Sequence, residues 1–159
     1  MKKNIITILC CCVNVFALAS DTNFVMQINE LWKSQNASNL LMFTEINVAT
    51  NPTPVTLFAR GATAMTLQRW GVEATNLFEQ AAQMISTNNA YSEFGKTRVI
   101  AKIQMNCVLF PAIIENFDQY SQPSWNTNGH VKLFTEFYDE APFYEDLMEI
   151  ATIELAEAD

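Results

Sequence analysis

The sequence predicts an all-α protein in which antiparallel helical hairpins form one domain. Apolar residues recur every three or four positions through most of the chain after residue 20, which is the spacing of a helix face. No segment in that part alternates apolar and polar residues over the length of a strand, and no linker rich in Gly or Ser divides it. We therefore expect a single helical domain over residues 20–159, built as a short stack of hairpins or as an irregular helical bundle.

The first nineteen residues have the pattern of a signal peptide. Lys2 and Lys3 are followed by an apolar run over residues 5–16 and by the small-x-small triplet Ala17-Leu18-Ala19. We expect cleavage near Ser20 and export to the periplasm or the extracellular space. The apolar run is shorter than the roughly 20 residues that span a bilayer, so no stable membrane anchor is expected after cleavage.

The positions of the cysteines bear on lipid attachment and on disulfide formation. Cys10, Cys11 and Cys12 lie in the leader, but the residues before them are not the small ones that lipid-modified leaders usually show, so lipid attachment is disfavoured. The mature chain then keeps only Cys107, which excludes an intramolecular disulfide. Its apolar neighbours predict a buried thiol that behaves as a small hydrophobic residue.

Two helices are expected before the centre of the chain. The first covers residues 21–35, with Asp21 or Thr22 as its cap, and the second covers residues 40–49. Pro52 and Pro54 stop the second helix, because the residue before a proline is pushed out of the helical region.

A helical hairpin over residues 54–87 organises the rest of the chain. Thr53 can cap its first helix, Pro54 fits the first helical position, and Gly71 supplies the break before the second helix. The second helix places the small residues Ala74 and Ala81 on its apolar face, which predicts a close crossing with the first.

The spacing of Ala74, Phe78 and Ala81 resembles the second helix of a tetratricopeptide repeat, and Gly61 with its small neighbours resembles the first helix of that motif. Gly95 follows Gly61 after 34 residues, the length of one such repeat. The resemblance covers this one hairpin. It implies a short tetratricopeptide-like stack and a scaffold that binds protein rather than a catalyst.

The C-terminal half predicts three more helices. Ser92 can cap a helix over residues 93–116, in which Pro111 predicts a kink or a restart near Cys107. Residues 118–129 form the longest segment without a helical pattern, and residues 130–138 and 143–158 are helical again.

Residues suited to catalysis are few. His130 is the only histidine, and Cys107 with His130 is the minimal nucleophile and base couple, which the apolar surroundings of the cysteine disfavour. Carboxylates are plentiful near the C-terminus, so a small hydrolase is one alternative. No phosphate loop, metal motif or calcium loop is present in the sequence, and we expect neither metal nor cofactor. The carboxylates in question are Glu136, Asp139, Glu140, Glu145, Asp146 and Glu149.

The charge is strongly acidic. Without Lys2 and Lys3 the chain has 7 basic and 17 acidic residues, a formal net charge of −10, and nine carboxylates follow Lys132 without a base. We therefore expect no nucleic acid as a partner, and an anionic membrane surface is disfavoured, because both are bound by clusters of Lys and Arg. We expect the acidic last helix either to pack near the basic cluster of Lys96, Arg98 and Lys102 or to display its acids to a basic partner.

Aromatic residues near the C-terminus form the candidate binding site. They predict either a groove lined with rings for a protein or peptide partner, or a core that closes the end of the helical stack. These residues are Trp125, Phe134, Phe137, Tyr138 and Phe143. The leading hypothesis is an exported, non-catalytic binding or assembly scaffold of undefined oligomeric state. The alternatives are the small hydrolase and a structural protein of the envelope.

Overall fold

The computed structural model describes residues 21–34, 36–68, 71–120, 141, 143–153, 155 and 156. For residues 68, 71 and 109–120 it describes the backbone alone. The expected all-α class is confirmed, because these residues form helices and no strand. One isolated antiparallel bridge joins Tyr91 to Leu155.

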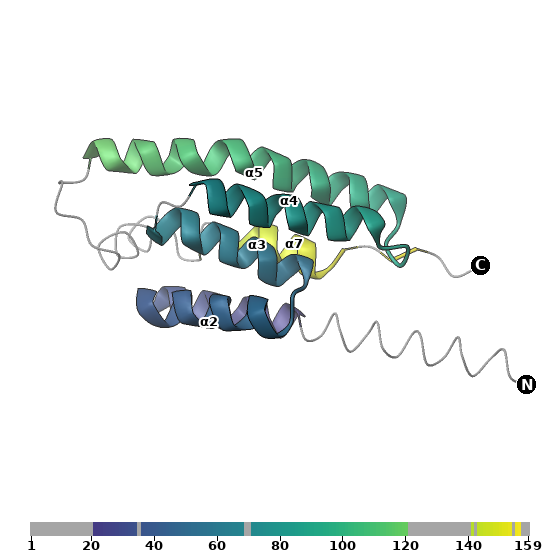
Figure 1. The fold of residues 1–159 in the computed structure, drawn as a ribbon, viewed down its shortest axis with the longest axis horizontal. Coiled ribbons are helices and arrows are strands. Elements are labelled where there is room, and N and C mark those ends of the chain that lie inside the picture. The colour runs from purple at the N-terminus through teal and green to yellow at the C-terminus, as the bar shows by residue number, and fades with distance from the viewer. Residues whose placement is uncertain are drawn as a thin grey trace, which may run out of the picture.

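The helices between residues 21 and 120 follow one another with short connections (Figure 1). Residues 21–33 form the first helix of the described chain. It is followed by α2 (Ala37–Thr50), α3 (Pro54–Thr63), the π-helical segment η1 (Ala64–Gln68), α4 (Gly71–Thr87), α5 (Glu93–Tyr120) and α7 (Tyr144–Ala151).

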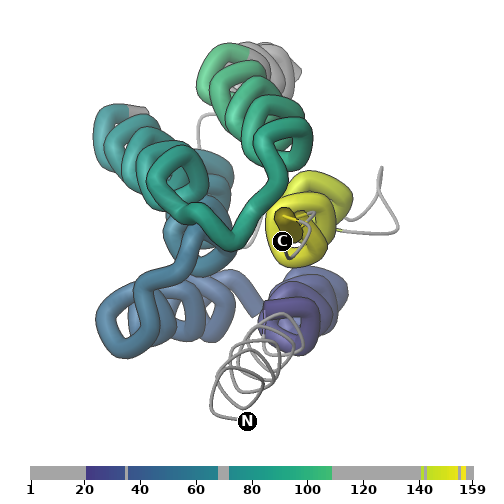
Figure 2. The backbone as a smooth tube through the Cα atoms, turned by 90° about the vertical axis from the view of Figure 1, so that its right-hand side faces the viewer, coloured from purple at the N-terminus to yellow at the C-terminus, as the bar shows by residue number. Residues whose placement is uncertain are grey.

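Helix α3 is the centre of the bundle. Every one of its residues is buried, including the polar Thr56, Arg60 and Thr63. It packs most extensively against α4, then against α2, and also contacts α7. In the view along the bundle (Figure 2), α7 lies between α5 and the 21–33 helix, so the segment nearest the C-terminus closes the side of the bundle.

Local signals in the sequence fix where α3 begins. The Thr53 hydroxyl accepts a hydrogen bond from the Thr56 backbone N–H at 3.2 Å, and the Thr56 hydroxyl accepts one from the Thr53 N–H at 2.8 Å. This reciprocal capping box, with Pro54 at the first helical position, satisfies N–H groups that have no partner within the helix. The predicted cap at Thr53 is therefore confirmed.

The predicted face of α4 is also confirmed. Ala74, Phe78 and Ala81 are fully buried, and the Phe78 ring lies 4.8 Å from the Phe58 ring of α3, centroid to centroid. The small residues let the two helix axes approach closely, and the paired rings fill the crossing between them.

Three predicted boundaries are wrong. Helix α2 begins at Ala37 rather than residue 40, because Asn36 caps it by accepting a hydrogen bond from the Asn39 N–H at 3.1 Å. Helix α5 continues through Pro111 without a restart and ends at Tyr120 rather than at residue 116. The last helix ends at Ala151 rather than residue 158.

The early end of α7 has a tertiary cause. Ile153 is buried, and the Ala156 N–H donates a hydrogen bond of 2.8 Å to the Ala90 carbonyl, beside the bridge between Tyr91 and Leu155. The chain leaves the helix and pairs briefly with the connection between α4 and α5. Within the described ranges, no helix has the length and apolar character needed to cross a bilayer.

Candidate functional site

Most of the predicted aromatic site lies outside the described residues. This holds for Trp125, Phe134, Phe137 and Tyr138, and also for His130. Phe143 is described: its ring is fully buried and meets the Trp32 ring edge-on, with centroids 5.7 Å apart. For Phe143 this is the position expected of a residue that closes the core.

The acidic last helix packs against the basic cluster of α5. Lys102 Nζ lies 3.1 Å from Asp146 Oδ1 and 2.6 Å from Glu149 Oε2, and Arg98 Nε lies 2.8 Å from Glu149 Oε1. Hydrogen bonding to Glu149 is the main reason why the pKa of Lys102 is raised, with burial opposing it and Asp146 adding to it. The first of the two expected arrangements for these acids is thus confirmed. These carboxylates join two helices.

The cavity beside this ion-pair network is very small. Asp146, Glu149 and Asn106 line a cavity between α3, α5 and α7 that does not admit a water molecule. Asn106 Nδ2 is buried there and has no hydrogen-bond partner among the described residues. A hydrolytic site needs room for water and substrate next to its carboxylates, and this cavity has none.

An open groove lies between α4 and α5. Its volume is about 360 Å³, at the lower end of the range of ligand pockets. Helix α4 contributes Phe78, Glu79, Ala82, Gln83 and Ser86, and α5 contributes Ile100, Ile103, Gln104 and Cys107.

The groove has an apolar floor and a polar rim. Phe78 and Ile103 are buried at its base, and Ala82, Ile100 and Cys107 are half-buried above them. The exposed rim consists of two carboxamides, one hydroxyl and one carboxylate, from Gln83, Gln104, Ser86 and Glu79. An apolar floor and a rim that can form hydrogen bonds together resemble the centre and edge of a protein interface.

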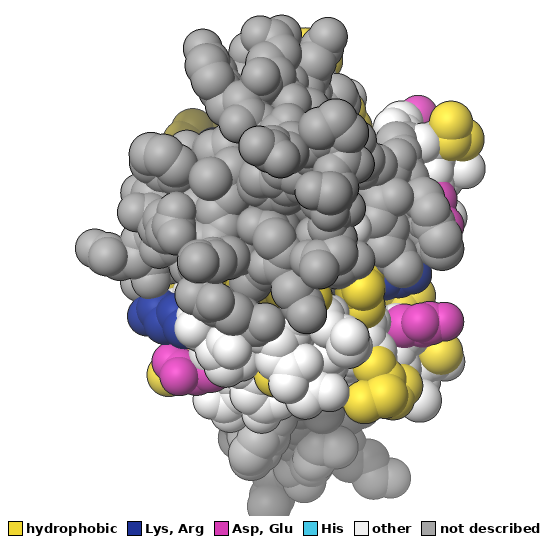
Figure 3. Space-filling model, turned by 90° about the vertical axis from the view of Figure 1, so that its left-hand side faces the viewer, with side chains coloured by type: hydrophobic (Ala, Val, Ile, Leu, Met, Phe, Trp, Pro, Cys, Tyr) yellow, Lys and Arg dark blue, Asp and Glu magenta, His cyan; other side chains and the backbone are white. Residues whose placement is uncertain are grey.

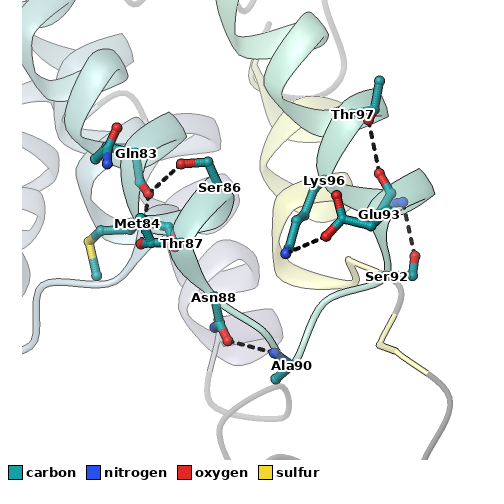
Figure 4. Close-up of polar contacts among 11 residues, drawn as sticks. Gln83, Met84, Ser86, Thr87, Asn88, Ala90, Ser92, Glu93, Lys96 and Thr97 are labelled. Atoms are coloured by element: carbon teal, nitrogen blue, oxygen red, sulfur yellow. Dashed lines mark hydrogen bonds and ion pairs between the residues drawn. The ribbon is translucent and has the colours of Figure 1, made fainter.

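The connection between α4 and α5 holds one end of this groove in place (Figure 4). The Gln83 carbonyl accepts hydrogen bonds from the hydroxyls of Ser86 and Thr87, both at 2.9 Å, which secures the last turn of α4. The Asn88 side chain then accepts from the Ala90 N–H at 2.9 Å, and Ser92 caps α5. These local bonds fix the geometry with which α5 leaves α4.

The surroundings of Cys107 in the groove disfavour its thiolate form. Burial raises the pKa of its thiol, and the nearby Glu79 carboxylate raises it further. A reactive cysteine needs the opposite, a positively charged environment that stabilises the thiolate. The predicted behaviour of Cys107 as a small hydrophobic residue agrees with this environment, although the thiol is half-buried rather than fully buried.

The described surface carries mixed charge. In Figure 3, basic and acidic side chains lie near one another and beside hydrophobic ones, and neither sign forms a patch in the described part of this face. Among the residues with defined placement, no three His, Cys, Asp or Glu side chains come together in a way that could hold a metal ion.

Sequence reasoning missed the groove. The available signal was the small size of Ala82 and Ser86, which lie one turn apart on the α4 face that borders α5. The volume of the groove depends on the orientation of α5 relative to α4. The apolar periodicity within either helix does not predict this orientation. Comparisons of this chain with protein-family models, curated proteins and solved structures find no match.

Proposed function

We propose that this protein is an exported, non-catalytic binding protein that docks a segment of another protein in the α4–α5 groove. The proposal rests on the groove itself. Its floor is apolar, its described rim is polar with Glu79 as the one charged residue, and its volume suits several side chains. Proteins bind one another through such features, a dry apolar centre inside a polar edge.

The chemistry of the neighbouring residues supports binding over catalysis. The one thiol in the groove has a raised pKa. Asp146 and Glu149, two of the carboxylates that suggested a hydrolase, are paired with Lys102 and Arg98 beside a cavity too tight for water. The thiol has space beside it but a raised pKa, and the paired carboxylates have no room for a substrate beside them.

The tetratricopeptide-like stack belongs to the same proposal. The close crossing of α3 and α4, with Gly61 against Phe78, supports a hairpin of that kind. Scaffolds made of helical hairpins bind protein segments on their exposed helix faces, which is the role proposed for the faces of α4 and α5. Export rests on the leader of residues 1–19, and the mass of the exported protein tests it by showing whether the chain starts near Ser20.

The binding role is tested with a variant that fills the groove. Ala82→Trp places an indole on the groove floor, and Gln80→Trp places the same group on the exposed outer face of α4 as a control. Each protein, expressed from its full-length gene with a C-terminal tag, is purified from producing cells, and the proteins that accompany it are quantified by mass spectrometry.

The expected result is a specific partner that accompanies the wild type and Gln80→Trp but not Ala82→Trp. Gln104→Trp, at an exposed position on the rim of α5, is a second groove variant. Identical recovery of accompanying proteins by all four chains would show that the groove is not a binding site.

A further inference from the structure

The shape of the α4–α5 groove favours a helical ligand over an extended one. The lining positions on α5 recur at i, i+3, i+4 and i+7, from Ile100 to Cys107, and those on α4 extend from Phe78 to Ser86. At 1.5 Å per residue the groove therefore runs along both helices for about 10–12 Å, roughly two helical turns. Such a groove accepts the ridge of side chains on a third helix.

The backbone groups of the lining residues also favour a helical ligand over an extended one. The nine described lining residues belong to α4 or α5, so their N–H groups, and their C=O groups apart from the last turn of α4, are engaged within helices. An extended peptide binds best where it can pair its own backbone with a free sheet edge, and the groove provides none. A helical segment satisfies its backbone internally and needs only side-chain contacts.

The charge of the groove selects among helices. Among the described residues that line it, Glu79 is the only charged one. The basic residues of α5 are occupied elsewhere: Arg98 and Lys102 pair with acids of α7, and Lys96 pairs with Glu93 at 2.8 Å. Within the described residues Glu79 has no basic partner, and the whole chain has a formal net charge of −8. A cation on the ligand is attracted here, and an anion is repelled.

We infer that the α4–α5 groove receives one apolar face of an amphipathic helix from a partner protein, and that this helix carries a lysine or arginine opposite Glu79. The inference rests on the proposed binding function and adds the class of ligand. The apolar face covers the floor from Phe78 to Cys107, and exposed Val108, one turn beyond Gln104, extends the apolar contact along α5.

The experiment is a selection from a phage-displayed library of helical peptides in which the residues of one face are randomised. The target is the protein expressed from its full-length gene. Peptides that bind the wild type and Gln80→Trp, but not Ala82→Trp or Gln104→Trp, are the groove ligands. We expect their sequences to show apolar residues at i, i+3 or i+4, and i+7, next to a lysine or arginine.

A charge exchange then tests the role of Glu79. For one selected peptide, replacing its basic residue by glutamate is expected to weaken binding about two- to five-fold, as for an exposed ion pair. With Glu79→Lys the preference is expected to reverse, so that the glutamate peptide binds better. Fluorescence anisotropy measures both affinities, and urea unfolding of each variant shows that it is folded.

Several results would overturn the inference. The first is that the selected groove ligands lack helical spacing or a basic residue. The second is that Glu79→Lys does not change which of the two peptides, basic or glutamate, binds better. The third is that no selected peptide loses binding when Ala82→Trp is introduced. If any of these occurs while Ala82→Trp still removes a native partner, the ligand class is wrong and the binding function stands. If Ala82→Trp also leaves the native partner in place, both are wrong.

Discussion

Gly61 of α3 lies directly against the ring of Phe78 of α4. A Cβ atom added at Gly61 would stand 2.8 Å from Phe78 Cε1, 3.0 Å from Cδ1 and 3.1 Å from the Ala74 carbonyl oxygen. Real Cβ atoms almost never approach a neighbour this closely, so only glycine allows the two helices to cross at this distance. The crossing holds the hairpin on which the α4 wall of the groove is built.

Gly61→Ala is therefore expected to lower the free energy of unfolding by about 1–3 kcal/mol, the usual cost of overpacking a core. Urea unfolding measures the change. The double variant Gly61→Ala/Phe78→Leu provides the control, because the smaller side chain makes room for the new methyl group. Its loss of stability is expected to be smaller than the sum of the two single losses. Additive losses would show that the two residues do not limit each other.

The network between α5 and α7 predicts a salt-dependent contribution to stability. Lys102→Met removes the cation shared by Asp146 and Glu149, whose side chains are only 14% and 20% exposed. We expect a loss of about 1 kcal/mol at low salt, toward the upper end for ion pairs that keep some exposure. Because Lys102 has a raised pKa in the folded state, this contribution is complete at neutral pH and is lost only as the pH rises above its ordinary value near 10.5.

Urea unfolding in low and high salt checks this, since screening should reduce the difference between Lys102→Met and wild type. Exposed Lys33 supplies the control through Lys33→Met. Equal effects of the two substitutions at low salt would mean that the network contributes nothing to holding α7.

The surroundings of Asp21 predict an unusual dependence of the protein's stability on pH. Its carboxyl lies at the corner where the 21–33 helix meets the start of α3: Oδ1 is 3.5 Å from the Thr53 hydroxyl, and its charge reaches Tyr91, whose pKa is raised mainly by burial. Burial raises the pKa of Asp21 to about 6, against the lowering effect of the hydrogen bond from Thr53. The folded protein therefore binds this proton more tightly than the unfolded chain.

The direction of the pH effect on stability follows from this difference in proton binding between the folded and unfolded states. The contribution of Asp21 to stability is greatest below pH 4 and is lost as the pH rises from about 4 to about 6. A two-unit shift corresponds to about 3 kcal/mol, but the partial exposure of the group reduces the expected effect to about 1 kcal/mol. Asp21→Asn should be more stable than wild type at pH 7 and should approach it at pH 4. A constant difference between the two proteins across this range would contradict the assignment.

The environment of Cys107 predicts slow reaction with alkylating reagents. Burial and the Glu79 carboxylate raise the pKa of its thiol, so less thiolate is present at pH 8 than in a free cysteine. Glu79→Gln removes one of the two causes and should speed alkylation by iodoacetamide, whereas Glu45→Gln, on the exposed surface of α2 away from the groove, should not. The same rate in all three proteins would show that Glu79 does not act on the groove floor.

The fold was more accessible from the sequence than the site. The Thr53 cap, the Pro54 start and the buried face of Ala74 and Ala81 are local patterns, and the structure confirms each. The end of the last helix depends on pairing between Leu155 and the distant Tyr91, which helical periodicity does not contain.

The groove escaped prediction for a related reason. Glu79 and Gln104 are ordinary exposed residues within their own helices, and they become one rim only because the corner at residues 88–92 sets α5 beside α4. The pairing of Lys102 with the acids of α7 was foreseen as one of two arrangements. An excess of bases on one helix and of acids on another indicates that the two helices pack together. The sequence does not give the distances between the charged groups.

The most direct test of the groove is a photo-crosslinker placed at Gln83, on its rim, in the protein made in producing cells, with the same group at Gln80 on the outer face of α4 as the comparison. Docking in the groove predicts a covalent product with a partner protein from position 83, none from position 80, and loss of the product when Ala82→Trp is added. Equal products from both positions, or a product from position 83 that Ala82→Trp leaves unchanged, would contradict it.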